Sequence, residues 1–263
     1  MDLGIKNKVA LVTAASQGLG KASAIELANE GVKLAICSRD QDKINQTAEE
    51  IQNLSGAEVL AVKADLDSTD DIENLIKEIE KKFNTVDILV NNTGGPKAGF
   101  FDDLSDEDWL KTFESTFLSA VRVTRKVLPF MKKNKWGRII NISSVSAKQP
   151  IDNLMLSNGV RMSIHGWAKT LSNQVASENI LINNVCPGFT HTERVDALIK
   201  TQVENSNSSR EEIIESIASD IPAKRVGQAN ELAALVVFLS SEKASYITGQ
   251  SIAVDGGISS LPI

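Results

Sequence analysis

The stretch from Val9 to Gly20 contains the residues best suited to hold a phosphate group. Val9 to Thr13 is a short apolar run, typical of a strand buried on both faces of a parallel sheet. A tight turn follows, and a helix begins near Gly18, where backbone N–H groups and the helix dipole favour an anion. Gly18 and Gly20 leave room for close approach, so the stretch predicts a pyrophosphate site. Its spacing is not G-x-G-x-x-G, and an ordinary strand–turn–helix is the alternative.

The end of the second predicted strand bears on which dinucleotide is bound. It reads Ile36-Cys-Ser-Arg-Asp40. A carboxylate at this strand end normally accepts a hydrogen bond from the ribose 2′-hydroxyl of NAD, whereas a basic residue suits the 2′-phosphate of NADP. Ser38 and Arg39 therefore indicate NADP rather than NAD, although Asp40 could neutralise the arginine. In the alternative interpretation, Arg39 is only a solvated loop charge.

The composition argues against several classes of protein. The chain has 263 residues, 42% hydrophobic and 24% charged, with a net charge of −6, which gives no reason to expect a nucleic acid or an anionic membrane as partner. No apolar run approaches the roughly 20 residues that span a bilayer. The first residues lack the basic start and apolar core of a signal peptide. Cys37 and Cys186 lie in apolar runs, so we expect buried thiols, no metal site and a cytoplasmic location.

Strand-like and helix-like segments alternate along the chain. We predict strands over 9–13, 32–37, 59–63, 87–91, 137–143, 181–186 and 251–254, and helices from 18 and over 40–54, 68–82, 105–133 and 153–177. This alternation predicts a Rossmann-type α/β fold, with one doubly wound parallel sheet of about seven strands and helices on both faces. No linker or repeat divides it, so residues 1–263 are expected to form a single domain.

The segment 188–225 breaks this alternation. About forty residues between Pro187 and Val226 contain no predicted strand, and two short amphipathic helices fit there, over 195–203 and 211–218. An insertion at the carboxyl end of a strand lies beside the ligand crevice of such sheets. We therefore expect a substrate lid, with a decorative excursion as the alternative.

Several short motifs follow one another in a fixed order. They are Thr13-Ala-Ala-Ser-Gln-Gly-Leu-Gly20, Asp65, Asn91-Asn-Thr-Gly94, Ile142-Ser-Ser-Val145, Pro187-Gly188 and Val254-Asp-Gly-Gly257. In this order and spacing, the chain resembles the short-chain dehydrogenase/reductase family over essentially its full length. It looks most like the branch of the 3-oxoacyl-carrier-protein reductases.

The resemblance implies an oxidoreductase that interconverts a carbonyl and a hydroxyl group on a small molecule by hydride transfer with NAD(P). It also implies a homotetramer, with a dimer as the fallback, and a catalytic serine at Ser144. The cofactor contacts that it implies are Thr13, Ser16, Gln17, Gly18, Leu19, Gly20, Ser38, Arg39, Asp65, Leu66, Asn91, Gly94, Arg161, Pro187, Gly188, Thr190 and Thr192.

The chain departs from the family at the residues that carry the chemistry. The family uses an asparagine, a serine, a tyrosine and a lysine, with the last two spaced Y-x-x-x-K on one helix. Counting from Ser144, the tyrosine position is Ser157 and the lysine position is Arg161, while the asparagine position falls on Thr116. The first glycine of the family's turn is also replaced, by Ala14. The only tyrosine, at position 246, lies beside the last predicted strand.

These replacements change what the site can do. A phenol with a pKa of about 10 can be tuned by a neighbouring cation, but an aliphatic hydroxyl has no comparable acidity. Arginine stays protonated and cannot relay a proton. Deleting the acid alone should cost about 10²–10⁴-fold in rate. Either carbonyl reduction is lost, or the acid is supplied in another way.

Three interpretations of the altered site follow. In the first, Ser144 and Ser157 hold a proton-carrying water and Arg161 stabilises the developing alkoxide. In the second, Arg161 binds a substrate carboxylate or phosphate, and His191 from the lid is the acid. In the third, the chain binds a dinucleotide without turnover, as a regulatory protein or pseudoenzyme.

Interpretations that give these residues no catalytic role are also open. Ser157 and Arg161 would then be surface or interface residues, His191 a polar loop residue, and His165 a packing or interface residue. A lyase or isomerase without redox chemistry would use the same crevice. We predict an NADP-dependent oxidoreductase with catalytic Ser144, Ser157 and Arg161.

Overall fold

The computed structural model describes residues 2–204, 206 and 208–260. Seven strands form one sheet in the order β3-β2-β1-β4-β5-β6-β9, and every neighbouring pair is parallel. The predicted fold class is thus confirmed. The strands are β1 (Val9–Val12), β2 (Lys33–Ser38), β3 (Val59–Lys63), β4 (Ile88–Asn91), β5 (Gly137–Ile142), β6 (Ile180–Pro187) and β9 (Ser251–Val254).

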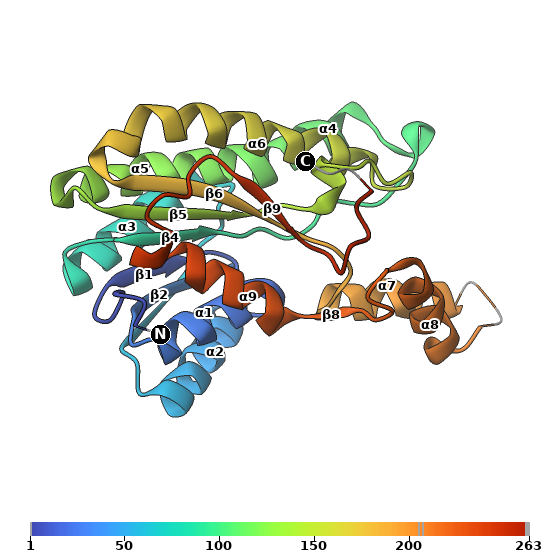
Figure 1. Ribbon diagram of the computed structural model, residues 1–263, viewed down its shortest axis with the longest axis horizontal. Helices are drawn as coiled ribbons and strands as arrows, with labels where there is room; N and C mark the ends of the chain where they lie inside the picture. The colour runs from blue at the N-terminus through green and yellow to red at the C-terminus, as the bar shows by residue number, and fades with distance from the viewer. Residues whose placement is uncertain (1, 205, 207, 261–263) are drawn as a thin grey trace.

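Helices cover both faces of the sheet (Figure 1). One face packs against α1 (Gly18–Asn29), α2 (Gln41–Ser55) and α9 (Ala229–Leu239), and the other against α3 (Thr69–Phe83), α5 (Ser119–Asn134) and α6 (Met155–Val175). Successive residues of β1 alternate between the two cores: Ala10 and Val12 face the first and Leu11 the second. Burial on both faces explains why the strands read as continuous apolar runs.

The long helix predicted over 105–133 is present over 106–134, but it is not α-helical throughout. It consists of α4 (Asp106–Thr112), a π-helical turn (Phe113–Leu118) and α5. A π-helical turn inserts a residue into the helical repeat, a change that apolar periodicity does not reveal. Thr116 lies in this turn, and its buried Oγ1 has no hydrogen-bond partner among the described residues.

The segment predicted as a lid contains the two expected helices, α7 (Glu193–Glu204) and α8 (Arg210–Asp220). Both project beyond the carboxyl edge of the sheet (Figure 1). Positions 205 and 207 of this segment lie outside the described residues. The expectation of no strand here is wrong, because β7 (Thr190–His191) pairs in parallel with β8 (Gly227–Gln228). A strand of two residues is too short to produce a hydrophobic pattern that the sequence would reveal.

Asparagine side chains join the central strands across the sheet. Asn91 of β4 donates to Asn141 of β5 (2.9 Å), and Asn141 donates to Asn184 of β6 (2.8 Å). Asn184 in turn donates to the hydroxyl of Ser251 of β9 (2.9 Å). The same residues are direct neighbours in the backbone pairing. This ladder penalises any slip in register, because a slip would leave buried amides without partners.

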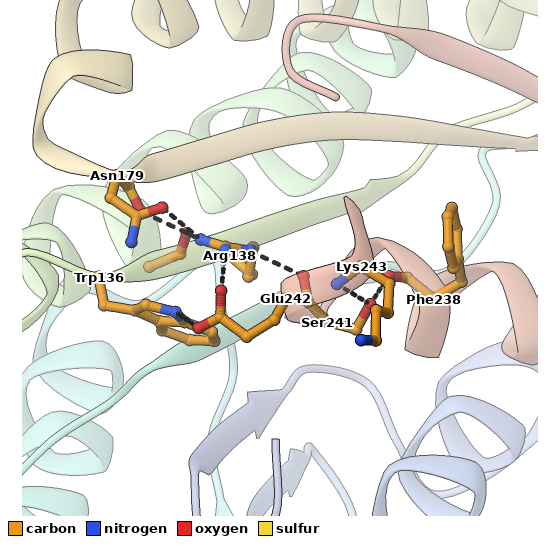
Figure 2. A network of polar contacts seen from close by, with 8 residues as sticks. Trp136, Arg138, Asn179, Phe238, Ser241, Glu242 and Lys243 are labelled. Carbon is orange, nitrogen blue, oxygen red and sulfur yellow. Dashed lines mark hydrogen bonds and ion pairs between the residues drawn. The ribbon is translucent and has the colours of Figure 1, made fainter. Parts of the chain in front are cut away.

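A second polar network closes the amino end of β5, opposite the lid (Figure 2). The fully buried side chain of Arg138 donates to the backbone oxygens of Gly137, Asn179 and Ser241. Its guanidinium stacks 4.4 Å from the ring centre of Trp136 and lies 3.7 Å from the carboxylate of Glu242. Burial lowers the pKa of Arg138, and Glu242 opposes that shift.

We expect Arg138→Met to lower the free energy of unfolding by about 2–4 kcal/mol, because it leaves three backbone oxygens without this donor. Urea unfolding measures this loss. Lys132→Met, which removes a mostly exposed partner of Glu178, should change stability by less than about 1 kcal/mol. Equal losses of stability in the two variants would contradict the stabilising role of the buried Arg138 side chain.

Across the described residues, no helix combines the length and the apolar character needed to cross a membrane.

Candidate functional site

A cavity of about 610 Å³ lies at the carboxyl ends of the parallel strands. Residues that follow β1, β2, β3, β4, β5 and β6 line it, and residues at the start of α7 complete the wall. Parallel strands bring their carboxyl ends to one edge of the sheet, so segments far apart in the sequence meet here. The described residues contain no group of His, Cys, Asp and Glu side chains arranged to hold a metal ion.

The turn after β1 is suited to an anion. Helix α1 starts at Gly18 with no side-chain cap and no acid in its first turn, whereas Asp40, Ser68 and Ser209 cap α2, α3 and α8. The first amides of α1 therefore lack the side-chain partner that these three helices have. The turn residues Ser16, Gln17, Gly18 and Leu19 line the cavity. A pyrophosphate would supply the missing acceptors.

The residues after β2 form a basic pocket. Arg39 and Lys43 line the cavity together with Ser38, whose hydroxyl donates to the backbone oxygen of Asp40 (2.9 Å). The Asp40 carboxylate accepts from the amides of residues 42 and 43, both at 3.1 Å. This carboxylate thus caps α2, and its other oxygen lies 3.9 Å from Nζ of Lys43, so it compensates part of the positive charge of the pocket. The pocket fits a 2′-phosphate better than a free 2′-hydroxyl.

Three serines lie together at the far end of the cavity. Ser144 follows β5, and its Oγ accepts from the amide of Ser146 (3.1 Å). Ser157, in the first turn of α6, lies with its Oγ 2.9 Å from the Oγ of Ser146. Both Ser144 and Ser157 line the cavity, as predicted, and Ser146 links them behind the wall. The sequence analysis missed Ser146, although its position two residues after Ser144 was a signal.

Arg161 lies one turn further along α6, and its side chain is buried. Its Nη1 donates to the backbone oxygens of Ile142 (3.0 Å) and Ser143 (2.9 Å), at the end of β5. Burial, reinforced by the positive charge of Arg194, lowers its pKa to about 10. The guanidinium is therefore protonated at neutral pH and lines the cavity as a fixed cation.

Comparison with known proteins identifies the family. Residues 13–259 match the sequence profile described as Enoyl-(Acyl carrier protein) reductase. The NADPH-dependent reductase BacG of Bacillus subtilis is 36% identical over 254 residues, which cover 96% of this chain and 98% of that protein. The 3-oxoacyl-[acyl-carrier-protein] reductase FabG of Aquifex aeolicus is 34% identical, over 98% of this chain and 100% of that protein.

Solved structures of similar proteins lead to the same family. The L-sorbose reductase of Gluconobacter frateurii, complexed with NADPH and L-sorbose, superposes with a TM-score of 0.96 at 31% identity, over 99% of this chain and 100% of that one. YwfH, an NADPH-dependent reductase involved in bacilysin biosynthesis, gives 0.92 at 35% identity, over 97% of this chain and 100% of that one. The chain belongs to the short-chain dehydrogenase/reductase family.

Most cofactor contacts implied by the family resemblance line the cavity. Three do not, and in this structure they serve the fold instead. Thr13 bonds the backbone of Asn92, Asn91 belongs to the asparagine ladder, and a Cβ on Gly20 would lie 2.6 Å from the side-chain amide of Asn92. The residues that line the cavity are Ser16, Gln17, Gly18, Leu19, Ser38, Arg39, Asp65, Leu66, Gly94, Arg161, Pro187, Gly188, Thr190 and Thr192.

Other lining residues were missed by the sequence analysis. Asn92, Thr93 and Ser143 lie within the family motifs but were not predicted to line the site, and neither periodicity nor a motif marks the others. The polar and charged ones are Lys43, Asp67, Asn92, Thr93, Lys111, Ser115, Ser143, Glu193 and Arg194. Arg194 belongs to the segment predicted as a lid, and no motif distinguishes it there.

The two histidines lie in different surroundings. His165, predicted as a packing residue, has its Nε2 2.9 Å from the Oγ of Ser143 and 3.6 Å from the Sγ of Cys186. Burial, with smaller effects of Lys148 and Arg161, lowers the pKa of His165 to about 4. His191, considered as an acid in one interpretation, is not among the residues that line the cavity.

The depressed pKa of His165 predicts a pH dependence. The unfolded chain binds this proton near pH 6.5 and the folded chain only near pH 4. The stabilisation of the folded chain by neutral His165 is therefore fully present above about pH 6.5 and is lost as the pH falls to about 4. The free energy of unfolding falls by about 3 kcal/mol over this range. His165→Asn should flatten the urea-unfolding free energy over this window, whereas His191→Asn should not. If the free energy of unfolding depends on pH in the same way in His165→Asn and in the unaltered protein, this role of His165 is refuted.

Ala14 occupies the position where the family motif has its first glycine. Its φ of +46° lies in the left-handed region, which costs an L-residue about 1–2 kcal/mol. The turn therefore keeps the backbone path that glycine allows, at the expense of local strain.

Ala14→Gly should raise the free energy of unfolding by about 0.5–1 kcal/mol, because relief of strain exceeds the added freedom of the unfolded chain. Ala15→Gly is the matched control. Ala15 is fully buried and is not among the residues of positive φ, so this change should lower stability by about 1 kcal/mol. Thermal and urea unfolding measure whether each substitution raises or lowers the free energy of unfolding.

Proposed function

We propose that this protein is an NADPH-dependent reductase of a small-molecule ketone or aldehyde, with a Ser144–Ser157–Arg161 site in place of the family's tyrosine and lysine. One observation carries this proposal. The two hydroxyls and the guanidinium line the same cavity as the uncapped turn of α1 and the basic pocket after β2. A dinucleotide held at the turn and the pocket would extend toward the serines.

NADPH is the cofactor that the site fits. The amides at the start of α1 would hold the pyrophosphate, and Ser38, Arg39 and Lys43 would hold the 2′-phosphate. Two similar proteins, BacG and YwfH, are named as NADPH-dependent reductases, and a third, the L-sorbose reductase, contains NADPH in its crystal structure.

The chain's own residues account for the remaining chemistry. NADPH, when bound, would supply the hydride, and the oxygen of the reduced carbonyl would take its proton from a water that solvent reprotonates. Ser144 and Ser157 orient the carbonyl and that water, since a serine hydroxyl is a poor proton source itself. The fixed charge of Arg161 favours the developing negative charge on the oxygen. The resulting alcohol and NADP⁺ leave the cavity.

We also propose that the protein assembles as a homotetramer, with a dimer as the fallback. Leu110, Phe113 and Met162 are exposed apolar side chains on α4, the π-helical turn and α6, and such faces become buried in oligomers. A cytoplasmic location is proposed from the two buried, unpaired cysteines.

A dinucleotide-binding protein without turnover is the second candidate. Ser157 is bonded to Ser146, and Arg161 donates to two backbone oxygens. Both side chains are thus held by the protein, and neither can act as the acid that a tyrosine provides.

The first experiment titrates the protein with NADPH and with NADH, following nicotinamide fluorescence and thermal unfolding. We expect NADPH to bind at least tenfold more tightly, and at 100 times Kd to add about 2.7 kcal/mol of apparent stability. Ketones, aldehydes and keto acids are then screened for loss of nicotinamide absorbance. Failure to bind either nucleotide would overturn both candidate functions.

The double variant Ser157→Tyr/Arg161→Lys separates the two candidates in the same assays. If the unaltered protein reduces carbonyls, the change should abolish that activity or slow it severely, which supports the serine–arginine site. If activity appears only in the double variant, the protein is the non-catalytic binder. Turnover of a substrate without a change in nicotinamide absorbance would instead indicate a lyase or isomerase.

A further inference from the structure

Arg194 joins the lid to the loop that follows β4. It lies in the first turn of α7, and its Nη1 and Nη2 donate to the backbone oxygens of Gly95 and Pro96, both at 2.6 Å. The two planar donors and two successive carbonyls fix the plane of the guanidinium. A Cβ on Gly95 would lie only 2.3 Å from Cζ of Arg194, so this close approach requires the glycine.

These two bonds leave Arg194 able to bind a ligand. A guanidinium has five N–H donors, and two are used here. The residue is partly exposed and lines the cavity. Arg161, on the opposite wall, uses only Nη1 for its two backbone contacts. Each guanidinium therefore keeps donors for an acceptor that the protein itself does not provide.

The positive charge of this pair is not compensated within the described residues. Neither guanidinium has a carboxylate within 4 Å, although eleven ion pairs occur elsewhere. The two are close enough that Arg194 lowers the pKa of Arg161. Two like charges facing one cavity without a counterion are unfavourable unless a ligand brings negative charge.

The acids of the cavity lie at its other end. Asp40, Asp65 and Asp67 follow β2 and β3, around the proposed adenosine pocket. Glu193 extends toward the turn after β1, where its Oε2 lies 3.5 Å from the place of a Cβ on Gly18. No carboxylate side chain lines the wall that holds Ser144, Ser157 and Arg161.

Apolar side chains complete the lining near the two arginines. Leu198 lies one helical turn after Arg194, on the same face of α7, and is 43% exposed. Ile151 and Leu154, from the segment before α6, also line the cavity. These side chains offer apolar surface to the body of a ligand.

We propose that Arg194 and Arg161 bind the carboxylate of an oxo-acid substrate that has an apolar body and whose ketone lies at Ser144 and Ser157. This inference rests on the proposed function, because it assigns the substrate class of the same site. Planar guanidinium forks match a carboxylate with paired hydrogen bonds. Since Arg194 also holds the lid to the β4 loop, binding of the acid would stabilise the closed lid.

The test compares keto acids with their methyl esters, which keep the ketone and the carbon chain but remove the charge. The probes are 2-oxohexanoate, 4-oxopentanoate and 5-oxohexanoate with the three esters, assayed with NADPH. The proteins are the unaltered chain, Arg194→Met, Arg194→Lys and Lys200→Met. Lys200 is exposed on α7 and does not line the cavity, so its variant is a control with the same loss of charge.

We expect at least one acid to have a kcat/KM at least tenfold above that of its ester. Arg194→Met should lower kcat/KM for that acid by about 10–100-fold, mainly through KM, since a hydrogen bond to a charged group contributes about 1.5–3 kcal/mol. The esters should lose at least fivefold less than that acid, since they share only the loss of the contact between Arg194 and the β4 loop. Arg194→Lys should retain part of the preference, and Lys200→Met all of it.

Binding measurements separate failure of this inference from failure of the proposed function. If no compound is reduced, yet the acids raise the melting temperature of the NADPH complex and Arg194→Met removes that shift, the anion site stands while the reductase proposal fails. If ketones are reduced without preference for the acid, the inference is overturned and the reductase stands. A weaker Kd for NADPH in Arg194→Met, with acids and esters affected equally, would show that the guanidinium serves the cofactor, and would overturn it too.

Discussion

The alignment of four strand ends at one edge of the sheet is the constraint on which the site depends. The asparagine ladder from Asn91 to Ser251 fixes the register of β4, β5, β6 and β9. Thr13 adds β1, because its hydroxyl donates to the backbone oxygen of Asn92 (2.7 Å) and accepts from the amide of the same residue (2.8 Å). Buried hydrogen bonds of this kind are costly to break. The turn after β1, the serines after β5 and the Pro187 turn after β6 are therefore held around one cavity.

The charges along the cavity are separated by function. At one end lie an uncapped helix start and a basic pocket, the proposed sites for phosphates. The nearby carboxylate of Asp40 is used in capping α2. At the other end, two guanidiniums lie without a carboxylate within 4 Å among the described residues, and Arg161 stands at the position proposed to correspond to the family's lysine. Lysine can shift its pKa and pass a proton, whereas arginine remains charged. The substitution thus exchanges proton relay for permanent positive charge, which suits recognition of an anion.

Polar contacts with the backbone help to hold the segment 188–225, the proposed lid, beside buried apolar side chains such as Ile199 and Ile221. Arg194 bonds two carbonyls of the β4 loop, and the short β7–β8 pair joins the base of the lid to the chain before α9. These contacts are few and lie near solvent, the pattern of segments that open at low cost. A ligand that bridges Arg194 and Arg161 would add to them only when bound. Substrate recognition and lid closure would then be one event.

The sequence by itself determined the fold and the phosphate-binding end of the site. Apolar runs buried on both faces marked the strands, and the Gly18 turn, Ser38 and Arg39 could be recognised because local geometry and charge are properties of short segments. Only the tertiary structure decided that Asn91 bonds Asn141, that Gly20 packs closely against Asn92, that Ser146 links Ser144 to Ser157, and that Arg194 lines the cavity. Each of these depends on which distant segment lies opposite a side chain, and sequence spacing along one element carries no information about that distance.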